Sequence, residues 1–546
     1  MCQCDFLKTI AGYYFSLHLS KTTLLYLYVY INYIDDSAFF FDYNDLLINF
    51  ILRKLGFMLS ISNTISLTRL ERKMRRAENF ADWKKAALEH DAMSGFETWK
   101  NKEESKSYDY INIRTRIDAL KEFRRLKDDT GLLFALNEGI HGNQGGMGKS
   151  TLYKLAKFGT KNLIEEYVDE IVGALEHIST IQESDEITKE DKLDFFERAS
   201  HCFGRSALML SGAGSLGHFH RGVIKTLFEH KLLPTVISGS SAGSVSAAVL
   251  GTYSDEELPT VLQSDSVLDP LQHEIDKRPK SLIRQQTDPA SLKLMLEAII
   301  PDITFQEAYE KTGRMISITI APYEEHQTSR LMNAVTSPNV YVRSAVMASC
   351  AVPGVYEPVM LMAKNVYGEA QPYLPDRRWV DGAVTDDLPA KRLARLYGVN
   401  HYIVSQANPL ALAIMKGEQY IPVPKGAKNV FRLSTHEILK SGEKFSRRYL
   451  RKIPDVGKTM SMFYSVLAQD YKGDVNIVPN FNFVDPQKLL GQLTSAEIKA
   501  LVIEGERSTW PQLEQIKVCS KIGHKLEEIL DHHSDHNIKR LYKKRR

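Results

Sequence analysis

Residues 206–250 read SALMLSGAGSLGHFHRGVIKTLFEHKLLPTVISGSSAGSVSAAVL and contain two strand-to-helix turns, each with a glycine-rich loop. The second turn, residues 239–243, has the spacing G-x-S-x-G, in which a serine occupies a turn so tight that only small residues fit beside it. Ser241 is therefore the candidate nucleophile. We expect this stretch to contain the active site.

The first turn combines an apolar run with a glycine-rich loop. Residues 207–210, Ala-Leu-Met-Leu, form a continuous apolar run of the kind found in buried parallel strands. Residues 212–217 then enter a segment expected to be helical to about His230, so that backbone N–H groups lie at a helix N-terminus and can bind an anion. Alone, such a loop also fits a simple tight turn or a dinucleotide site, so its meaning depends on Ser241.

The second turn repeats the plan of the first. Residues 235–238 are expected to form a strand and residues 242–250 a helix rich in small side chains. Two strands linked through a helix are expected to be parallel neighbours joined by a right-handed crossover, with both loops at the same edge of the sheet. The expected fold class is α/β with a mostly parallel central sheet, and residues 314–321 are expected to add another strand.

The composition is that of a globular protein large enough for two or three domains. The 546 residues include 43% hydrophobic and 25% charged residues, and a single core rarely supports such a length. A formal net charge of +3 gives no reason to expect nucleic acid as a partner. The five cysteines suit neither a zinc site nor a closed disulfide set, which favours a reducing, intracellular compartment.

Residues 1–65 form a hydrophobic N-terminal extension rich in Tyr, Phe, Leu and Ile. Lys21 divides its uncharged runs and Asp35 with Asp36 closes the second, so neither reaches the roughly 20 apolar residues that a membrane span needs. An interfacial helix or a mis-started extension is the favoured interpretation. A single tilted transmembrane span over residues 9–34 is the less favoured alternative.

Residues 66–202 have helical patterns and are expected to form a helical domain. Segments 69–88, 110–127 and 152–178 carry apolar residues at approximately helical spacing among charged ones. Residues 142–150 resemble a phosphate-binding P-loop, but Asn143 stands where that pattern requires glycine and no hydrophobic strand precedes it. We expect a connector between helices there rather than a nucleotide site.

A serine nucleophile needs a base, and Asp381 in the sequence Trp-Val-Asp-Gly-Ala is a candidate. Asp-Gly is a common turn dipeptide, so this residue alone carries little weight. Together with the two glycine motifs, however, it resembles the patatin-like phospholipase family. That resemblance implies a patatin-like three-layer sandwich, a Ser-Asp dyad and an oxyanion hole in the glycine loop, carried by Ser241, Asp381, Gly212, Ala213 and Gly214.

Further segments resemble the family's branch of intracellular triacylglycerol lipases, which also carries a helical N-terminal domain. The resemblance extends over roughly residues 77–479 and includes segments 82–83, 166–170, 203–208, 229–234, 304–308, 336–340, 348–354 and 404–409. Two positions depart from the family pattern: Ala213 interrupts the usual three glycines, and Leu216 replaces a basic residue that could hold a phosphate headgroup. Losing that charge favours neutral glycerides. The acyltransferase signature, a histidine followed five positions later by aspartate, does not occur in this sequence.

A Ser-Asp-His triad is the competing arrangement, because G-x-S-x-G also occurs in α/β-hydrolases. His401 and His436 both follow Asp381 and could complete such a triad. His401 precedes the apolar run 402–404 and is better interpreted as the start of a strand.

Three flanking features bear on access to lipid. Residues 254–302, with an amphipathic segment at 292–300, are a candidate lid or an ordinary surface insertion. Basic residues gather within segment 440–452 and again in segment 539–546. Such charge runs are most often solvated faces, and the alternative is docking to an anionic membrane surface.

The sequence thus predicts four regions: 1–65, the hydrophobic extension; 66–202, the helical N-terminal domain; 203–410, the patatin-like catalytic domain; and 411–546, a mainly helical basic region. The predicted function is a serine acyl hydrolase acting on glycerolipid esters, with triacylglycerol as the leading substrate. A phospholipase A or lysophospholipase and a catalytically dead lipid-surface adaptor are the alternatives. We expect no metal or cofactor, and we expect an intracellular protein peripherally associated with a membrane or lipid-droplet surface.

Overall fold

The structure is a computed structural model that describes residues 63–182, 187–263, 289–324, 328–409, 411–412, 473–480 and 491–544. The chain divides into two compact units, Met1–Arg69 and Leu70–Arg546. Most of the N-terminal extension, the basic segment 440–452 and His436 lie outside the described residues. Among the residues that are described, no helix is both long enough and apolar enough to cross a bilayer.

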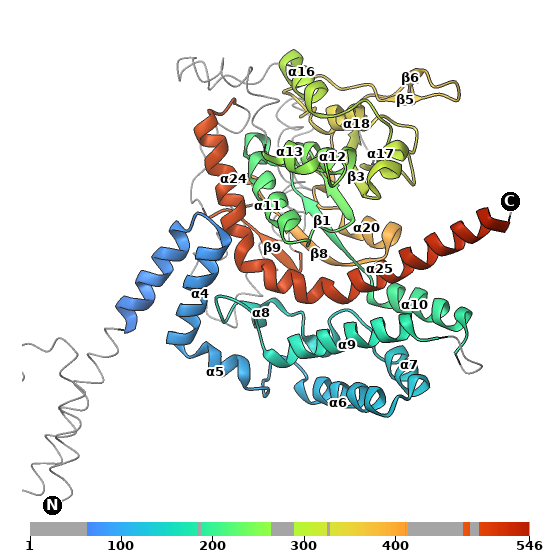
Figure 1. The fold of residues 1–546 in the computed structure, drawn as a ribbon. Coiled ribbons are helices and arrows are strands. Elements are labelled where there is room, and N and C mark those ends of the chain that lie inside the picture. The colour runs from blue at the N-terminus through green and yellow to red at the C-terminus, as the bar shows by residue number, and fades with distance from the viewer. Residues whose placement is uncertain are drawn as a thin grey trace, which may run out of the picture. The chain divides into compact units, whose positions relative to one another are not determined.

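The N-terminal part of the larger unit is helical, as predicted (Figure 1). After a helix that ends at residue 76, its helices are α4 (Phe80–Ser94), α5 (Phe96–Asn101), α6 (Tyr110–Leu126), α7 (Asp129–Asn137), α8 (Ser150–Tyr153), α9 (Asn162–Thr180) and α10 (Lys189–Phe203).

Two of the three predicted helical segments are interrupted. Segment 110–127 is confirmed as α6, but segments 69–88 and 152–178 are each broken once. The preceding helix ends at residue 76, and Asn79 starts α4 by accepting a hydrogen bond from the N–H of Asp82. The second break separates α8 from α9 and contains Gly159 at φ 79°, outside the helical range.

The segment that resembles a P-loop connects α7 to α8 without a preceding strand, as expected. Asn143 has φ 58° and is followed by the short 3-10 helix η1 (Gln144–Gly146). The ammonium group of Lys149 donates to the carbonyl oxygen of Ser107 at 3.2 Å, so it is engaged within the protein. This geometry does not resemble a phosphate cradle.

The central sheet has the strand order β4-β3-β2-β1-β8-β9, and β7 also pairs with β3. The pairings among β1, β2, β3, β8 and β9 are parallel, whereas β4 and β7 run antiparallel to β3. The mostly parallel α/β sheet predicted from the sequence is therefore confirmed. The strands are β1 (Arg205–Leu210), β2 (Val236–Gly239), β3 (Met315–Pro322), β4 (Arg330–Asn333), β7 (Trp379–Asp381), β8 (Val399–Ser405) and β9 (Val475–Ile477), with a separate hairpin of β5 (Met362–Lys364) and β6 (Ala370–Pro372).

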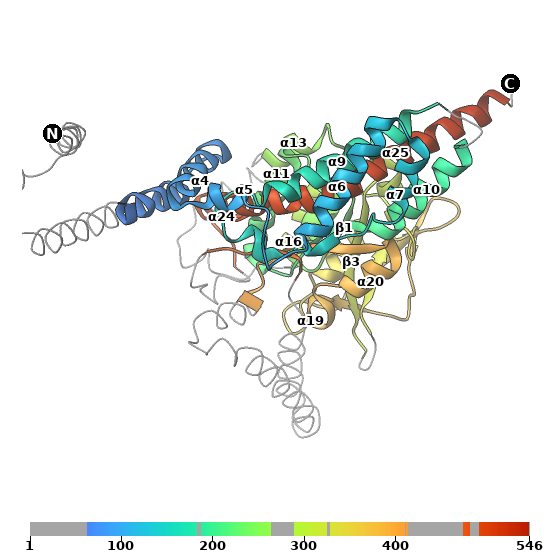
Figure 2. The ribbon, with the colours of Figure 1, turned by 90° about the horizontal axis from the view of Figure 1, so that it is seen from below.

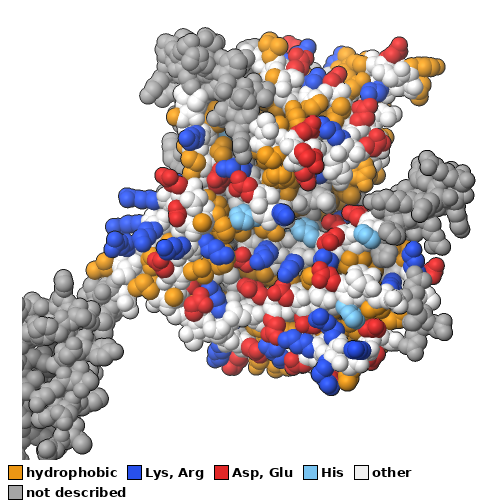
Figure 3. Space-filling view, in the orientation of Figure 1, with side chains coloured by type: hydrophobic (Ala, Val, Ile, Leu, Met, Phe, Trp, Pro, Cys, Tyr) orange, Lys and Arg blue, Asp and Glu red, His pale blue; other side chains and the backbone are white. Residues whose placement is uncertain are grey.

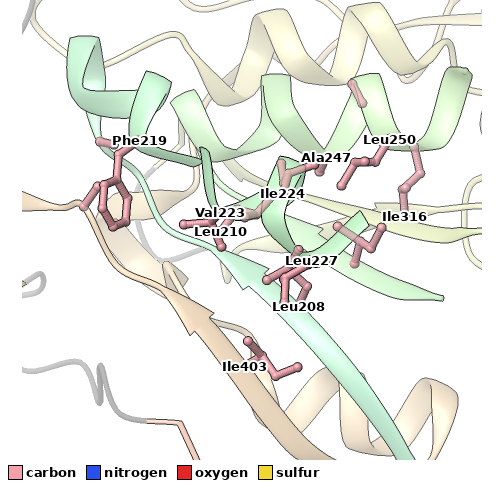
Figure 4. Packing of buried hydrophobic residues seen from close by; sticks show 14 of the residues in the cluster. Leu208, Leu210, Phe219, Val223, Ile224, Leu227, Ala247, Leu250, Ile316 and Ile403 are labelled. Atoms are coloured by element: carbon pink, nitrogen blue, oxygen red, sulfur yellow. The ribbon is translucent and has the colours of Figure 1, made fainter. Parts of the chain in front are cut away.

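Helices cover both faces of this sheet, which makes three layers. Successive side chains of a strand point to opposite faces, and β1 follows this rule. Leu208 and Leu210 belong to one buried cluster, with residues of α11 (His218–Glu229), α12 (Ala242–Thr252) and α18 (Val342–Ser349). Ala207 and Met209 belong to another, with residues of α20 (Ala390–Tyr397). Figure 4 shows the first cluster from close by. The other helices of this part of the chain are α13 (Leu258–Gln263), α16 (Pro289–Ile299), α17 (Phe305–Thr312) and α19 (Ala383–Asp386).

The C-terminal residues pack closely with both parts of this unit. Helix α24 (Ser495–Thr509) lies against α11, where Lys225 Nζ and Glu506 Oε1 are 2.7 Å apart. Helix α25 (Leu513–Lys544) passes between the N-terminal helices and the sheet (Figures 1 and 2). Its Glu527 pairs with Arg205 at the start of β1 at 3.0 Å, and its Lys525 pairs with Glu176 of α9 at 2.8 Å. The predicted boundary at residue 410 stays a prediction, although β9 from beyond it extends the catalytic sheet.

Candidate active site

Both glycine-rich turns lie at the carboxyl edge of the sheet because β1 and β2 are parallel neighbours. The register pairs Leu210, the last residue of β1, with Gly239, the last residue of β2. The N–H of Ser240 continues this pairing by donating to the carbonyl oxygen of Leu210 at 3.2 Å. The predicted juxtaposition of loop and elbow is therefore present in the structure.

Ser241 stands at a strained turn between β2 and α12. Its φ is 50° and its ψ is −123°, a conformation that costs a non-glycine residue of order 1–3 kcal/mol. A Cβ atom on Gly243 would lie 2.2 Å from the carbonyl oxygen of Leu210, so the turn can approach β1 only with glycine at that position. These features are those of a nucleophile elbow.

Neighbouring hydroxyl groups hold the Ser241 backbone in this conformation. Its N–H donates to Ser349 Oγ at 2.9 Å, and Ser349 in turn donates to the carbonyl oxygen of Thr319 at 2.8 Å. Its carbonyl oxygen accepts a 2.6 Å hydrogen bond from Ser244 Oγ. The strain at the elbow is thus opposed by hydrogen bonds from both α12 and α18, and the Ser241 N–H is already used.

Asp381 reaches the elbow because β7 lies in line with β2. Gly239 pairs with Ile318 of β3, and Asp381 pairs with Ile320 two residues farther along. At Ile320, β4 pairs with one edge of β3 and β7 pairs with the other edge. The edge that pairs with β7 is the same edge that pairs with β2 earlier along β3. Because β7 runs antiparallel to β3, its last residue faces the end of β2.

The carboxyl group of Asp381 is buried beside Ser241. Its Oδ1 accepts a hydrogen bond from the N–H of Ala383 at 2.8 Å, and the Ser241 side chain also hydrogen-bonds to it. Burial raises the pKa of Asp381 to about 7, and these two hydrogen bonds oppose that rise. A Cβ atom on Gly382 would lie 2.5 Å from the backbone of Thr319, which explains glycine after the aspartate. A base with a pKa near neutrality is suited to accept a proton at physiological pH.

The glycine loop forms a concave backbone at the start of α11. Ala213 has φ −147°, so alanine causes no strain there, and Gly214 follows at φ 54°. Such an alternation of negative and positive φ turns successive N–H groups toward a common point and creates an anion site. Within the described part of the chain, the N–H groups of Ala213 and Gly214 have no hydrogen-bond acceptor.

One of the predicted oxyanion donors, the N–H of Gly212, has an acceptor within the protein. The N–H of Gly212 donates to Asp387 Oδ1 at 2.7 Å, so in this arrangement it is not available to a substrate oxygen. Sequence reasoning missed Asp387, which lies six residues after Asp381 and is buried. Burial raises the pKa of Asp387 to about 7, the N–H of Gly212 and the amide of Asn408 oppose the rise, and the charge of Asp381 adds to it.

The two histidines near the strands play structural parts. His401 pairs with Ser206 near the start of β1, and its Nδ1 is 2.9 Å from Ser206 Oγ. Four residues separate this position from Leu210, about 13 Å along a strand, so His401 lies at the wrong end of the sheet to join a triad. The interpretation of His401 as a strand-start residue is confirmed. His220 is buried near the carboxyl edge of the sheet, where its ring contacts Ser405 Oγ and the carbonyl oxygen of Ser211. Burial lowers the pKa of His220 to about 4.

Cys350 does not offer an alternative nucleophile. Cys350 is buried beside the carbonyl oxygen of Ser241, and burial raises the pKa of its thiol to about 12, so it is not a thiolate nucleophile. No group of three His, Cys, Asp or Glu side chains in the described ranges is placed to hold a metal ion.

Comparison with known proteins identifies two domains in the chain. Residues 61–201 match a domain of unknown function called DUF3336, and residues 208–394 match the patatin-like phospholipase domain. The chain is 34% identical to triacylglycerol lipase SDP1L of Arabidopsis thaliana, over 84% of this chain and 58% of that protein. It is 29% identical to triacylglycerol lipase ptl3 of Schizosaccharomyces pombe, over 82% of this chain and 94% of that protein.

Coverage of these relatives is uneven. The chain spans between 50% and 58% of the first four curated relatives that it matches. Among solved structures, VipD from Legionella pneumophila is 14% identical, with 61% of this chain and 68% of that chain covered and a TM-score of 0.27. Ser241, Asp381 and Asp387 all fall within the residues that match the patatin-like domain. The chain therefore carries a patatin-like phospholipase domain at residues 208–394, preceded by a DUF3336 domain at residues 61–201.

Proposed function

We propose that this chain is a serine acyl hydrolase that cleaves glycerolipid esters through a dyad of Ser241 and Asp381. The observation that supports it best is the strained elbow serine hydrogen-bonded to a buried carboxyl group whose pKa is raised to about 7. An arrangement of this kind activates a hydroxyl group without histidine. It also speaks against a catalytically dead adaptor, which would have no reason to keep the strain at Ser241.

The reaction begins when Ser241 Oγ attacks the ester carbonyl carbon and Asp381 accepts the hydroxyl proton. The tetrahedral intermediate carries its negative charge on the former carbonyl oxygen, which the N–H groups of Ala213 and Gly214 stabilise. Asp381 returns the proton to the departing alcohol as the carbon–oxygen bond breaks and the acyl-enzyme forms. Water then attacks the acyl-enzyme, Asp381 accepts its proton, and the fatty acid leaves as Ser241 is reprotonated.

Triacylglycerol is the leading substrate within this class. The relatives SDP1L and ptl3 are named triacylglycerol lipases. In addition, Leu216 of the glycine loop is buried in the hydrophobic cluster, so this position offers no cation to a phosphate headgroup. The charged side chain that contacts the loop, Asp387, would repel such a headgroup when ionised.

Fatty-acid release from triacylglycerol, monoacylglycerol and phosphatidylcholine, measured side by side in identical emulsions, tests this substrate assignment. We expect triacylglycerol to be hydrolysed at least about tenfold faster than phosphatidylcholine, since a phosphate headgroup finds no cation at Leu216. Preferential hydrolysis of phosphatidylcholine would instead support the phospholipase alternative.

We also propose that the protein associates peripherally with an intracellular membrane or lipid-droplet surface. Four basic side chains are exposed on the helix that ends at residue 76, namely Arg72, Lys73, Arg75 and Arg76, while Leu70 and Met74 of the same helix are buried. Figure 3 shows Lys and Arg side chains gathered on the part of the surface that this helix occupies. Each basic residue near an anionic membrane surface contributes about 1 kcal/mol to binding.

Reversal of these four charges to glutamate is expected to weaken sedimentation with anionic vesicles by at least about 100-fold at low salt. Neutral phosphatidylcholine vesicles should bind the wild type weakly, and added salt should release the protein from anionic ones. Binding that depends on neither lipid charge nor salt would contradict the proposal.

A further inference from the structure

Asp387 joins three loops that meet at the elbow. Its Oδ1 accepts the Gly212 N–H at 2.7 Å, and its Oδ2 accepts a hydrogen bond from Asn408 Nδ2 at 3.2 Å. Its own carbonyl oxygen accepts a hydrogen bond from Ser240 Oγ at 3.0 Å. One residue thus connects the glycine loop after β1, the serine elbow after β2 and the segment after β8.

Gly212 is closely surrounded by residues of the site. A Cβ atom on Gly212 would lie 3.1 Å from Ala383 Cβ, 3.4 Å from Asp387 Oδ1 and 3.5 Å from Ser241 Cβ. The residue before it is held from the other side, because Ser211 donates its N–H to the carbonyl oxygen of Ser405 and its Oγ accepts the N–H of Ala407 at 2.9 Å. The peptide that leads into the loop is therefore fixed on both sides.

We propose that Asp387 is a positioning residue: by binding the Gly212 N–H, it fixes the glycine loop so that the N–H groups of Ala213 and Gly214 point to the oxygen that becomes negative during catalysis. This inference rests on the proposed function for its catalytic consequence, but the clamp itself is a property of the folded chain. A carboxylate is a stronger acceptor for an N–H group than a neutral oxygen. Preorganised donors stabilise the transition state only if they do not have to reorient during the reaction.

The position of Asp387 explains why a charged group is retained in a buried place. Asp387 is 1% exposed, and the negative charge of Asp381 is among the causes that raise the pKa of its carboxyl group. Burying an ionisable group without partners is costly, and here the two N–H donors are the compensation. The neighbouring Asp386 differs, because it pairs with Arg392 at 3.3 Å and has no hydrogen bond to the glycine loop in the structure.

Three variants of the full-length chain test the proposal: Asp387→Ala, Asp387→Asn and, as the matched control, Asp386→Asn. The first readout is hydrogen exchange followed by mass spectrometry on the peptide that contains Gly212. We expect exchange at least about tenfold faster in Asp387→Ala, an intermediate rate in Asp387→Asn, whose amide oxygen can still accept the Gly212 N–H, and the wild-type rate in Asp386→Asn.

The second readout is hydrolysis of a soluble short-chain ester. Loss of oriented oxyanion donors lowers kcat by about 100- to 1,000-fold, so we expect a fall of this size in Asp387→Ala with KM changed less than about threefold. Asp387→Asn should lose only about tenfold in kcat, because its neutral amide oxygen is a weaker acceptor for the Gly212 N–H than a carboxylate. If Asp387→Ala does not fold, the test rests on Asp387→Asn. Roughly tenfold losses in kcat and in protection of the Gly212 N–H from exchange support the positioning role of Asp387. Wild-type kcat together with wild-type exchange would overturn it.

The two readouts separate failure of the clamp from failure of the proposed function. A wild-type chain without ester hydrolysis would remove the proposed function, while hydrogen exchange would still decide whether Asp387 holds Gly212. Unchanged exchange in a folded Asp387→Ala would overturn the inference, as would a loss of kcat in Asp386→Asn equal to that in Asp387→Ala.

Discussion

Replacement of Ser241 with alanine is expected to lower fatty-acid release from triacylglycerol by at least about 1,000-fold. The variant lacks the nucleophile, and the acyl-enzyme cannot form without it. What remains is the contribution of the oxyanion donors and of substrate binding, which is small compared with the loss. The measurement is fatty-acid release at saturating substrate with purified full-length protein.

The matched control is Ser246→Ala, which changes a partly buried serine on α12, the helix that follows Ser241. It should retain wild-type hydrolysis. Alanine lacks only the hydroxyl group of serine, and the backbone strain at φ 50° is the same for both residues. The melting temperature of Ser241→Ala should therefore be close to that of the wild type. Substantial hydrolysis by folded Ser241→Ala would show that another group attacks the ester.

Replacement of Asp381 with asparagine is expected to lower kcat by about 1,000- to 10,000-fold. Asparagine has nearly the same shape and can still accept the Ala383 N–H, but it cannot take up the Ser241 proton. The control Asp386→Asn, which changes a carboxyl group paired with Arg392, should retain activity. Wild-type kcat in Asp381→Asn would support a base other than Asp381.

The raised pKa of Asp381 also predicts how activity depends on pH. Only the ionised carboxylate accepts a proton, so kcat/KM of the wild type should rise with pH and level off above a midpoint near 7. The residual activity of Asp381→Asn should lack this midpoint.

Stability should follow the opposite direction. The pKa of Asp381 is about 7 in the folded chain and 3.8 as its ordinary value. Between these values the folded state binds more protons than the unfolded state, so this residue makes the free energy of unfolding fall as pH rises. Asp381→Asn should lose that part of the pH dependence and melt no lower than the wild type above pH 7. A base retained at the expense of stability is expected of an active site.

The sequence predicts those parts of the fold that depend on local pattern. The apolar runs at 207–210 and 235–238 become β1 and β2, and the glycines after each run mark the two turns. Because a strand-helix-strand unit has one favoured topology, the proximity of the glycine loop to Ser241 also follows from the sequence. Spacing alone did not reveal the helix ends at Asn79 and near Gly159, because a single cap or a positive φ overrides an apolar period.

Long-range pairing decides the rest of the site. The Asp-Gly turn at 381 has the same local pattern whether β7 runs parallel or antiparallel, and only its pairing with β3 brings Asp381 to Ser241. The role of Asp387 is even harder to predict from the sequence. Residues 386–389, Asp-Asp-Leu-Pro, resemble a solvated turn, whereas the folded chain buries Asp387 against Gly212. No local feature of the sequence distinguishes the N–H groups of Ala213 and Gly214, which have no acceptor in the described part of the chain, from the N–H of Gly212, which is bound to Asp387.

The most direct test of the Ser241-Asp381 dyad is to treat the full-length chain with a fluorophosphonate and locate the adduct by mass spectrometry. We expect a single adduct on the peptide that contains Ser241, no adduct at this position in Ser241→Ala, and labelling at least about 100-fold slower in Asp381→Asn. Failure of the wild-type protein to react, or an adduct on a residue other than Ser241, would contradict it.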